Sequence, residues 1–338
     1  MKKIAALLVT IVFAAVAVFL MPRLREEFSP EPLAPSSPPM RLARYYWPGQ
    51  FWKEIAQDRG WFAEAGLAVE LVDTNPDYYA SLDAMVAGAL DENDFTLFDA
   101  VHYQAKGADL VIILNTANST GVDGIVGRRE LKGIDDLRGR TIGVSRNTYL
   151  QYLLQEVLLR HRLSLEDVRL QDMPTEKAVV AFAEGSLDAV VAWEPLLGKA
   201  AAQGNGHLLF NTSKMVNSLP GVSVVRRQFV EERPADIQRF VTVWKRTVSY
   251  MEENPDEAFG IIAQRYGVPL SEVLALVKAN RIAGVKENRI AFTYASGRSS
   301  LHGLVLRLAS YQLQHKLIEV PVDVFSLIEP RFFQEVTR

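Results

Sequence analysis

Residues 139–195 decide the fold, and they read GRTIGVSRNTYLQYLLQEVLLRHRLSLEDVRLQDMPTEKAVVAFAEGSLDAVVAWEP. Residues 141–144 predict a short buried strand, and the apolar periodicity over residues 149–159 predicts a helix after it. The pattern then repeats as a strand, a helix and a strand, at residues 168–171, 175–184 and 187–193. Strands that alternate with helices in this way predict an α/β fold with a parallel sheet.

A polar turn at residues 145–148 separates the first of these strands from its helix. With Asn147 or Thr148 as the cap, the helix start would direct unpaired N–H groups and the positive end of its dipole beyond the strand. Such a place suits an anion, and Arg146 either adds a fork-shaped cation there or is a solvated surface arginine. The third strand ends in Trp193 and Glu194, which should face the same crevice at the carboxyl ends of the strands.

Two segments carry a resemblance to a known family. They are DLRGRTIGV at residues 136–144, followed after the helices by AEGSLDAVVAWEP at 183–195, and YYWPGQFWKEIAQDRGWFAEAGLAVELVD at 45–73. From about Arg41 to its end, the chain resembles the periplasmic solute-binding proteins for nitrate, aliphatic sulfonates, taurine and thiamine-pyrimidine precursors. The resemblance implies a two-lobed type II periplasmic-binding-protein fold with parallel-type sheets and a hinge of two crossings.

Length and composition agree with a globular protein of two lobes. The chain has 338 residues, of which 49% are hydrophobic and 23% charged, and its net charge of −3 offers no general attraction to nucleic acid. We therefore expect no nucleic-acid partner. The absence of cysteine excludes disulfides, thiolate metal sites, cysteine nucleophiles and a bacterial lipoprotein anchor.

The N-terminus carries an export or anchoring signal. Two lysines precede an uncharged apolar run at residues 4–21, which as a helix would span about 27 Å at about 1.5 Å per residue. This N-terminal hydrophobic helix is either a signal peptide, with a cleavage site near Ala17, or a retained anchor that tethers the protein to the inner membrane. We expect a periplasmic protein in both cases.

The expected domain organisation follows from these segments. Residues 1–28 are the signal peptide or anchor and the proline- and serine-rich residues 29–40 are a linker. Lobe 1 comprises residues 41–122 and 222–338, and lobe 2 comprises residues 123–221. In lobe 1 we expect strands at 41–47, 69–73, 95–98, 110–114 and 219–226, helices at 51–65, 78–87 and 100–106, and a helical tail from residue 234.

Polar and aromatic residues at expected strand ends are further candidates for ligand contact. Tyr46 and Trp47 lie where the first strand meets its helix, so that one of them lines the pocket or both pack beneath the helix. Asp99 is a helix cap, a partner for a ligand amine, or both. The polar turn expected at residues 115–121 holds Asn118 and Ser119 beside Asp123, either to orient a ligand or for turn formation.

These candidates set the expected charge of the ligand. The candidates include three carboxylates, Asp99, Asp123 and Glu194, and one cation, Arg146. Desolvating three carboxylates around a simple anion is unfavourable. The ligand should therefore carry positive charge or several donors, as an amino-sulfonate zwitterion or an amino-pyrimidine does. The full candidate ligand-binding set is Tyr46, Trp47, Asp99, Asn118, Ser119, Asp123, Arg146, Asn147, Thr148, Trp193 and Glu194.

Catalytic and cofactor motifs are missing from the sequence. It contains no HExxH pair, no GxSxG elbow and no Walker-type phosphate loop, and Leu209 stands where a dinucleotide motif starting at Gly204 needs its third glycine. We therefore expect no enzyme activity, no cofactor and no metal, with a pyrimidine synthase that consumes its own histidine as a remote alternative.

The expected function is capture of a small solute and its delivery to the permease of an ABC importer. The alternative is an anchored sensory binding protein that reports its ligand to a membrane signalling protein, a kinase or a cyclase. We expect a monomer in both cases.

Overall fold

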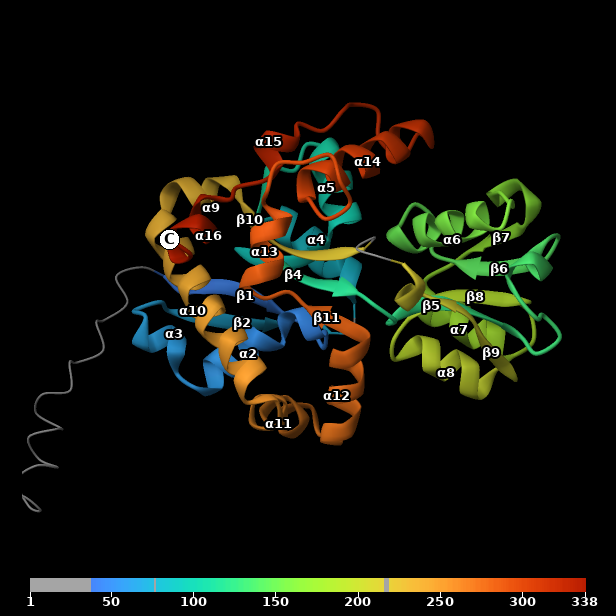
Figure 1. The fold of residues 1–338 in the computed structure, drawn as a ribbon, viewed down its shortest axis with the longest axis horizontal. Helices are drawn as coiled ribbons and strands as arrows, with labels where there is room; N and C mark the ends of the chain where they lie inside the picture. Colours follow the sequence, from blue (N-terminus) through green and yellow to red (C-terminus); the bar gives the residue numbers. More distant parts are fainter. Residues whose placement is uncertain (1–37, 76, 216–218) are drawn as a thin grey trace, which may run out of the picture. The chain divides into compact units, whose positions relative to one another are not determined.

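A six-stranded sheet forms the first lobe of the computed structural model (Figure 1). Its strands are ordered β11-β4-β10-β3-β1-β2, and their bounds are Met40–Arg44 for β1, Val69–Asp73 for β2, Glu92–Thr96 for β3, Leu110–Ser119 for β4, Pro220–Arg226 for β10 and Asn280–Ile282 for β11. β1 runs parallel to β2 and β3, whereas β10 runs antiparallel to β3 and β4.

The structure describes residues 38–75, 77–215 and 219–338. The signal peptide or anchor expected at residues 1–28 lies outside the described residues, as does the linker expected at 29–40 apart from its last three residues. Residues 39–338 form one compact unit that contains both sheets of the protein. Within the described part of the chain, no helix combines the length and the apolar character that crossing a membrane requires.

A five-stranded sheet forms the second lobe. Its strands are ordered β7-β6-β8-β5-β9, and their bounds are Asp123–Arg128 for β5, Thr141–Val144 for β6, Arg169–Asp172 for β7, Ala189–Trp193 for β8 and Gly206–Asn211 for β9. β6 lies parallel to β7 and β8, as the alternating pattern of strands and helices predicts. β5, however, runs antiparallel to β8 and β9.

The two-lobed fold is thus confirmed, with mixed rather than purely parallel sheets. The antiparallel strands β5 and β10 are the ones that follow the two crossings between the sheets. The residue bounds expected for the two lobes stay a prediction.

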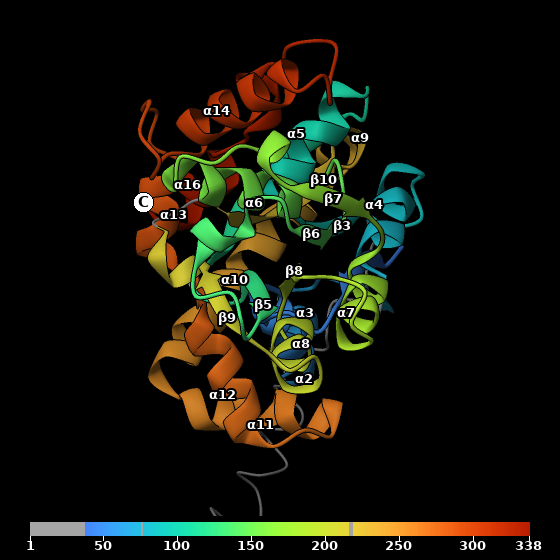
Figure 2. The ribbon, with the colours of Figure 1, turned by 90° about the vertical axis from the view of Figure 1, so that its right-hand side faces the viewer.

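Three helices cover the second sheet. α6 (Tyr149–Arg160) lies on one side of it, and α7 (Thr175–Ala183) and α8 (Leu196–Gln203) lie on the other, as Figures 1 and 2 show. Of the two caps considered for α6, Thr148 is the observed one, because its side chain accepts a hydrogen bond from the Leu150 N–H at 3.2 Å. Asn147 instead adopts the left-handed conformation, with φ of 61°.

In the first lobe, two expected elements end earlier than predicted. β1 stops at Arg44 rather than Trp47, and a 3₁₀ turn, η1 (Pro48–Gln50), follows it. The helix expected at 51–65 is divided into α2 (Phe51–Asp58) and α3 (Trp61–Glu64). Gly60 lies between them with φ of 71°, a conformation that glycine adopts without steric strain and that ends a helix.

The remaining helices of the first lobe pack around its sheet. They are α4 (Tyr78–Val86), α5 (Leu97–Ala105), α9 (Arg227–Glu232), α10 (Pro234–Glu253), α11 (Pro255–Tyr266), α12 (Leu270–Ala279), α13 (Val285–Ala291), α14 (Leu301–Gln314), α15 (Val324–Leu327) and α16 (Arg331–Val336). Trp52 of α2 and Phe240 of α10 meet in the core with their ring centroids 4.9 Å apart. The helical tail expected from residue 234 is confirmed as an assembly of helices.

Two crossings connect the lobes, and one buried side chain joins them. The chain passes from β4 to β5 through residues 120–122 and returns from β9 to β10 through residues 212–219. Thr212 Oγ1 lies 2.6 Å from Ser119 Oγ and accepts a hydrogen bond from the Gly121 N–H at 2.9 Å. The two connections are therefore held together at the hinge.

Candidate ligand-binding cleft

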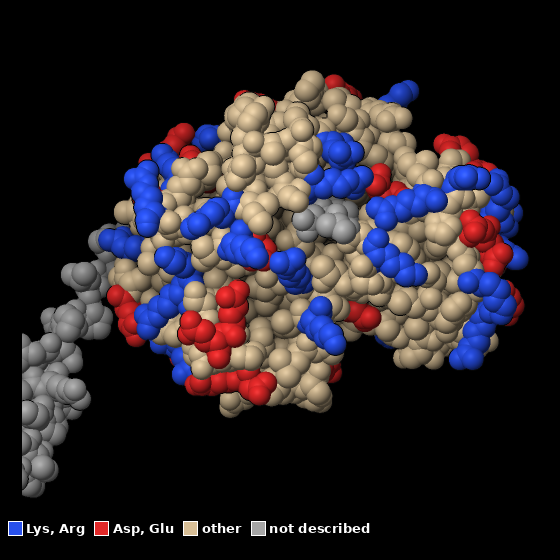
Figure 3. Space-filling model, viewed as in Figure 1, with Lys and Arg blue, Asp and Glu red and all other residues tan. Residues whose placement is uncertain are grey.

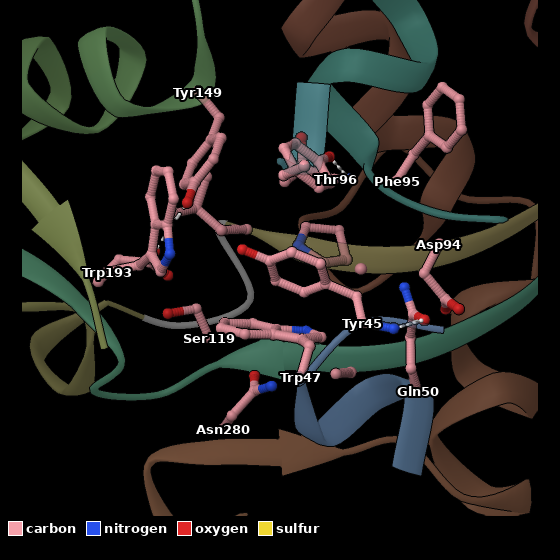
Figure 4. Close-up of a pocket in the computed structure, with 16 residues that line it drawn as sticks. Tyr45, Trp47, Gln50, Asp94, Phe95, Thr96, Ser119, Tyr149, Trp193 and Asn280 are labelled. Atoms are coloured by element: carbon pink, nitrogen blue, oxygen red, sulfur yellow. Dashed lines mark hydrogen bonds between the residues drawn. The ribbon is translucent and has the colours of Figure 1, made fainter. Parts of the chain in front are cut away.

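A cavity of about 70 Å³ lies where strand ends of the two sheets meet (Figure 4). Its lining is drawn from both lobes and comprises Tyr45, Trp47, Gln50, Tyr78, Asp94, Phe95, Thr96, Ala117, Ser119, Asp123, Tyr149, Trp193, Leu219, Pro220, Gly221 and Asn280. One water molecule needs roughly 10–15 Å³ of such volume, so the cavity holds about five. In this conformation the cavity suits a small solute rather than a polymer.

Aromatic rings from both lobes line the cavity. Tyr149 and Trp193 of the second lobe lie with their ring centroids 6.2 Å apart, and Tyr45 and Tyr78 of the first lobe with theirs 6.4 Å apart. Figure 4 shows the Tyr149 and Trp193 rings across the cavity from those of Tyr45 and Trp47. A ligand bound there would be held between rings from both lobes.

Asp123 is a buried carboxylate at the start of β5. The Tyr149 hydroxyl donates to its Oδ1 at 3.2 Å. Burial raises the pKa of Asp123 to about 6, although hydrogen bonds from Ser119 and Tyr149 act in the opposite direction. Near neutral pH this carboxylate is charged and has hydroxyl groups rather than a cation beside it.

Asp99 lies behind the wall of the cavity rather than in its lining. The interpretation of Asp99 as the helix cap is wrong, because α5 begins at Leu97 and Thr96 caps it by accepting from the Asp99 N–H at 3.1 Å. Asp99 Oδ2 accepts from the hydroxyl groups of Thr96 at 2.6 Å and of Tyr78 at 2.9 Å. Burial raises the pKa of Asp99 to about 6. The carboxylate thus positions Tyr78, which does line the cavity.

Two candidates are turned away from the cavity by strand and turn geometry. Tyr46 packs against Phe51 and Tyr266, with ring centroids 5.5 Å and 4.7 Å away. Asn118 lies between two lining residues of β4, so the alternation of a strand turns its side chain to the other face. The predicted polar turn at 115–121 is wrong, because β4 continues through it to Ser119.

The polar turn before α6 also lies outside the described lining. Arg146 and Asn147 are exposed, and the Arg146 N–H donates to Asp172 Oδ1 at 3.0 Å. Thr148 is buried, but its hydroxyl donates to the Ser145 carbonyl at 2.7 Å in addition to capping α6.

Glu194 is also outside the described lining. Its Oε2 accepts from the Gly198 N–H at 3.0 Å, in the first turn of α8. Of the eleven candidates, the cavity brings together Trp47, Ser119, Asp123 and Trp193.

Asp94 is a lining residue that sequence reasoning missed. It belongs to an ionic cluster in which Lys53 Nζ lies 2.7 Å from Asp94 Oδ2 and 2.6 Å from Glu92 Oε2, with all three side chains buried. Burial would lower the pKa of Lys53, but the two carboxylates raise it above its ordinary value. The run Asp-Glu-Asn-Asp at residues 91–94, next to an apolar strand, was the available signal, since buried acids need a cation.

A second contact between the lobes lies beyond the cavity. We call it the latch, and it consists of Tyr152 and Gln155 of α6 with Tyr311 and His315 of the first lobe. The Tyr152 and Tyr311 ring centroids are 4.8 Å apart, the Tyr311 hydroxyl donates to Gln155 Oε1 at 3.1 Å, and Gln155 Nε2 lies 2.9 Å from His315 Nε2. The latch is therefore a contact between the lobes in addition to the hinge.

Basic residues gather outside the cavity. Figure 3 shows Lys and Arg side chains over the region where Figure 1 places β11 and α13. A second, more polar cavity of about 100 Å³ there is lined by Arg281, Lys286 and Arg298 together with Asn118. Arg281 is already paired with Glu287 at 2.6 Å and Arg298 lies 3.7 Å from Glu156.

A cleft between two α/β lobes, at strand ends and beside two crossings, defines the class of two-lobed periplasmic binding proteins. The model of the NMT1/THI5-like family matches residues 54–258, and the chain belongs to that family.

Individual proteins show the same likeness. The putative aliphatic sulfonates-binding protein of Bacillus subtilis is 27% identical over 295 residues, which is 83% of each chain. The crystal structure of the periplasmic aliphatic sulphonate binding protein SsuA from Escherichia coli superposes with a TM-score of 0.71 at 19% identity, covering 87% of this chain and 93% of that one. The desulfurization enzyme DSZB has the same fold, with a TM-score of 0.63 at 16% identity and coverage of 89% and 99%. The resemblance seen in the sequence is confirmed.

Proposed function

We infer that this protein captures a small polar organic solute between its lobes and delivers it to the permease of an ABC importer. The observation that carries this is the cavity itself, because its walls come from both lobes and a change in the angle between them would open or close it. The relatives named as sulfonate-binding proteins support the same function. The solute belongs to the range of sulfonates, taurine-like zwitterions and amino-pyrimidine precursors.

The protein performs no chemistry on this solute. Because the same fold occurs in a desulfurization enzyme, the fold alone does not decide between binding and catalysis. The chain contains no cysteine to act as a thiolate nucleophile. Tyr149 and Tyr78 line the cavity, but their hydroxyl groups already donate hydrogen bonds to Asp123 and to Asp99, respectively. We therefore propose capture and release, by a monomer that works in the periplasm either free or tethered by residues 4–21.

Native mass spectrometry of the full-length protein tests this function. Protein purified without denaturation should carry one small solute per chain, and calorimetry with the released solute should give one site per chain. Chemical conversion of that solute by the protein would overturn the proposal in favour of an enzyme.

Uptake of the identified solute separates importer delivery from sensing. Cells that lack the protein should lose uptake of the solute if it serves an importer. Unchanged uptake together with a lost transcriptional or second-messenger response would favour the sensory alternative. The apolar run at residues 4–21 supports the sensory alternative, because a sensor would be retained at the membrane by such an anchor.

A further inference from the structure

The charge of the cavity differs from what an anionic ligand requires. None of the described lining residues is a lysine, an arginine or a histidine, whereas Asp94 and Asp123 are both present. The nearest buried lysine, Lys53, is already shared between Asp94 and Glu92 and also donates to the Ala43 carbonyl at 3.2 Å. An anion entering this space would meet two carboxylates, of which only Asp94 has a cation, Lys53, beside it.

At the helix starts near the cleft, one backbone N–H group of each helix is already bonded to a side chain of this protein. Three helices, α5, α6 and α8, begin near the cleft, and each has a first-turn N–H bonded to a side chain of its own lobe. Thr96 accepts from the α5 start, Thr148 from the α6 start and Glu194 from the α8 start. The helix starts therefore have weakened capacity for a ligand anion.

One lining residue has a buried acceptor atom that still needs a donor. Asp94 Oδ1 accepts no hydrogen bond from any described residue, although the side chain is only 5% exposed. Its other oxygen, Oδ2, is the one that pairs with Lys53. A buried carboxylate oxygen without a partner is unfavourable, and an N–H group of a ligand would remove that cost.

Aromatic rings complete an environment for positive charge. The faces of tyrosine and tryptophan rings carry negative potential, so they attract ammonium groups at short range. Figure 4 shows the rings of Tyr45, Trp47, Tyr149 and Trp193 around one space, and Asp123 belongs to the lining of the same cavity. The same ring faces would disfavour a sulfonate group placed against them.

We propose that the solute is a small organic cation, an ammonium or amidinium compound without an anionic group, held by Asp123, Asp94 and the surrounding aromatic rings. This inference rests on the proposed capture of a small organic solute, and it replaces the sulfonates and zwitterions of the proposed range by cations. It separates this chain from its relatives named for sulfonates, because the cationic site that a sulfonate needs is not among the described lining residues.

Calorimetry with probes of matched size tests the charge preference of the full-length protein. The probes are propylammonium and choline as cations, taurine as a zwitterion and ethanesulfonate as an anion. We expect at least one of the two cations to bind at least about tenfold more tightly than taurine, a difference of about 1.4 kcal/mol. Ethanesulfonate should give no measurable heat.

Two matched variants test whether Asp123 is responsible for the binding of the cation. Asp123→Asn should weaken binding of the preferred cation by about 30-fold or more, the effect expected when one partner of a buried charge pair is lost. Asp135→Asn removes the same charge from an exposed site of the second lobe, and it should leave the affinity within about twofold. Because Asp123→Asn could impair folding, the preference of the unmodified protein is the primary result, and the melting temperature of each variant is measured alongside.

The outcomes separate this inference from the proposed function. Tighter binding of taurine or ethanesulfonate than of both cations would overturn the inference and leave solute capture standing. Failure of both cations to bind would likewise overturn it. Failure of solute capture is detected independently, because native mass spectrometry would then find no bound solute of any charge.

Discussion

At the residue scale, two buried carboxylates in or next to the cleft accept hydrogen bonds from hydroxyl groups. Asp99 is held by Thr96 and Tyr78, and Asp123 by Ser119 and Tyr149. For Asp99 and Asp123 burial raises the pKa to about 6, above the ordinary 3.8. The folded state consequently binds protons more tightly than the unfolded chain. Stability contributed by these groups is full below about pH 4 and is lost as the pH rises through about 6.

Asp99→Asn should raise stability at neutral pH and reduce its pH dependence. Both hydroxyl groups donate to the same oxygen, Oδ2, so the asparagine oxygen can accept both while the buried charge is removed. We expect the free energy of unfolding at pH 7.5 to increase by about 1–3 kcal/mol, with about 1.4 kcal/mol for each unit of pKa shift. The measurement is urea unfolding at pH 5 and pH 7.5. An equal loss of stability at both pH values would contradict the argument, and exposed Asp135→Asn serves as the control.

At the scale of elements, close approach of strands and helices sets the position of the site. Gly124 follows Asp123 in β5, and a Cβ atom there would lie 2.4 Å from the Phe210 carbonyl oxygen of β9 and 3.1 Å from Leu197 Cδ2 of α8. The absence of a side chain therefore allows β5 to pair with β9 beneath α8. This packing fixes where β5 begins and hence where Asp123 enters the cavity.

Gly124→Ala should destabilise the second lobe. The nearest atom is backbone, which moves less easily than a side-chain end, so we expect a cost of about 1–3 kcal/mol. Gly133→Ala is the matched control, because a Cβ at Gly133 meets no atom within 4 Å. Denaturant unfolding of both variants gives the comparison. Equal midpoints for the two variants would show that β5 and β9 separate without strain.

The latch between α6 and the first lobe is a second feature at this scale. Gln155→Ala removes the hydrogen-bond partner of both Tyr311 and His315. We expect a larger fraction of open molecules, because each lost hydrogen bond contributes about 1 kcal/mol. Single-molecule fluorescence transfer between labels on the two lobes measures this fraction. Exposed Gln203→Ala on α8 is the control, and an unchanged distribution in Gln155→Ala would mean that the latch does not bias closure.

At the scale of the whole molecule, one buried side chain joins the two connections between the lobes. Thr212 is fully buried and bonds to Ser119 Oγ and the Gly121 N–H, so it joins the outgoing and the returning crossing. A hinge of this kind combines a fixed axis with free rotation of the lobes. Ser119 belongs both to the hinge and to the lining of the cavity.

Thr212→Val should loosen this connection. Valine has nearly the same shape but offers no acceptor, so the Gly121 N–H is left without its partner, at an expected cost of about 1–3 kcal/mol. Hydrogen exchange of residues 119–122 should accelerate before that of the two sheets. Exposed Thr242→Val on α10 is the control. Acceleration spread evenly over both sheets would indicate general destabilisation instead of a hinge effect.

The sequence by itself determined the elements and the class of fold. Alternation of strands and helices over residues 139–195 predicted β6, β7 and β8 and their parallel pairing. Apolar periodicity is a local property of the sequence, and strands that alternate with helices pair in parallel. Local signals also led to Trp47, Ser119, Asp123 and Trp193, since ligand crevices form at strand ends.

Only the tertiary structure decided which side chains share the cavity. The antiparallel course of β5 and β10 and the continuation of β4 through a polar stretch depend on pairing across long sequence distances. The start of α5 at Leu97 depends on the local cap by Thr96. These pairings turn Tyr46 and Asn118 away and bring in Asp94, Tyr78 and Asn280. Side-chain direction changes with every residue of strand register, so local patterns predict a strand end but not the face it offers to a ligand.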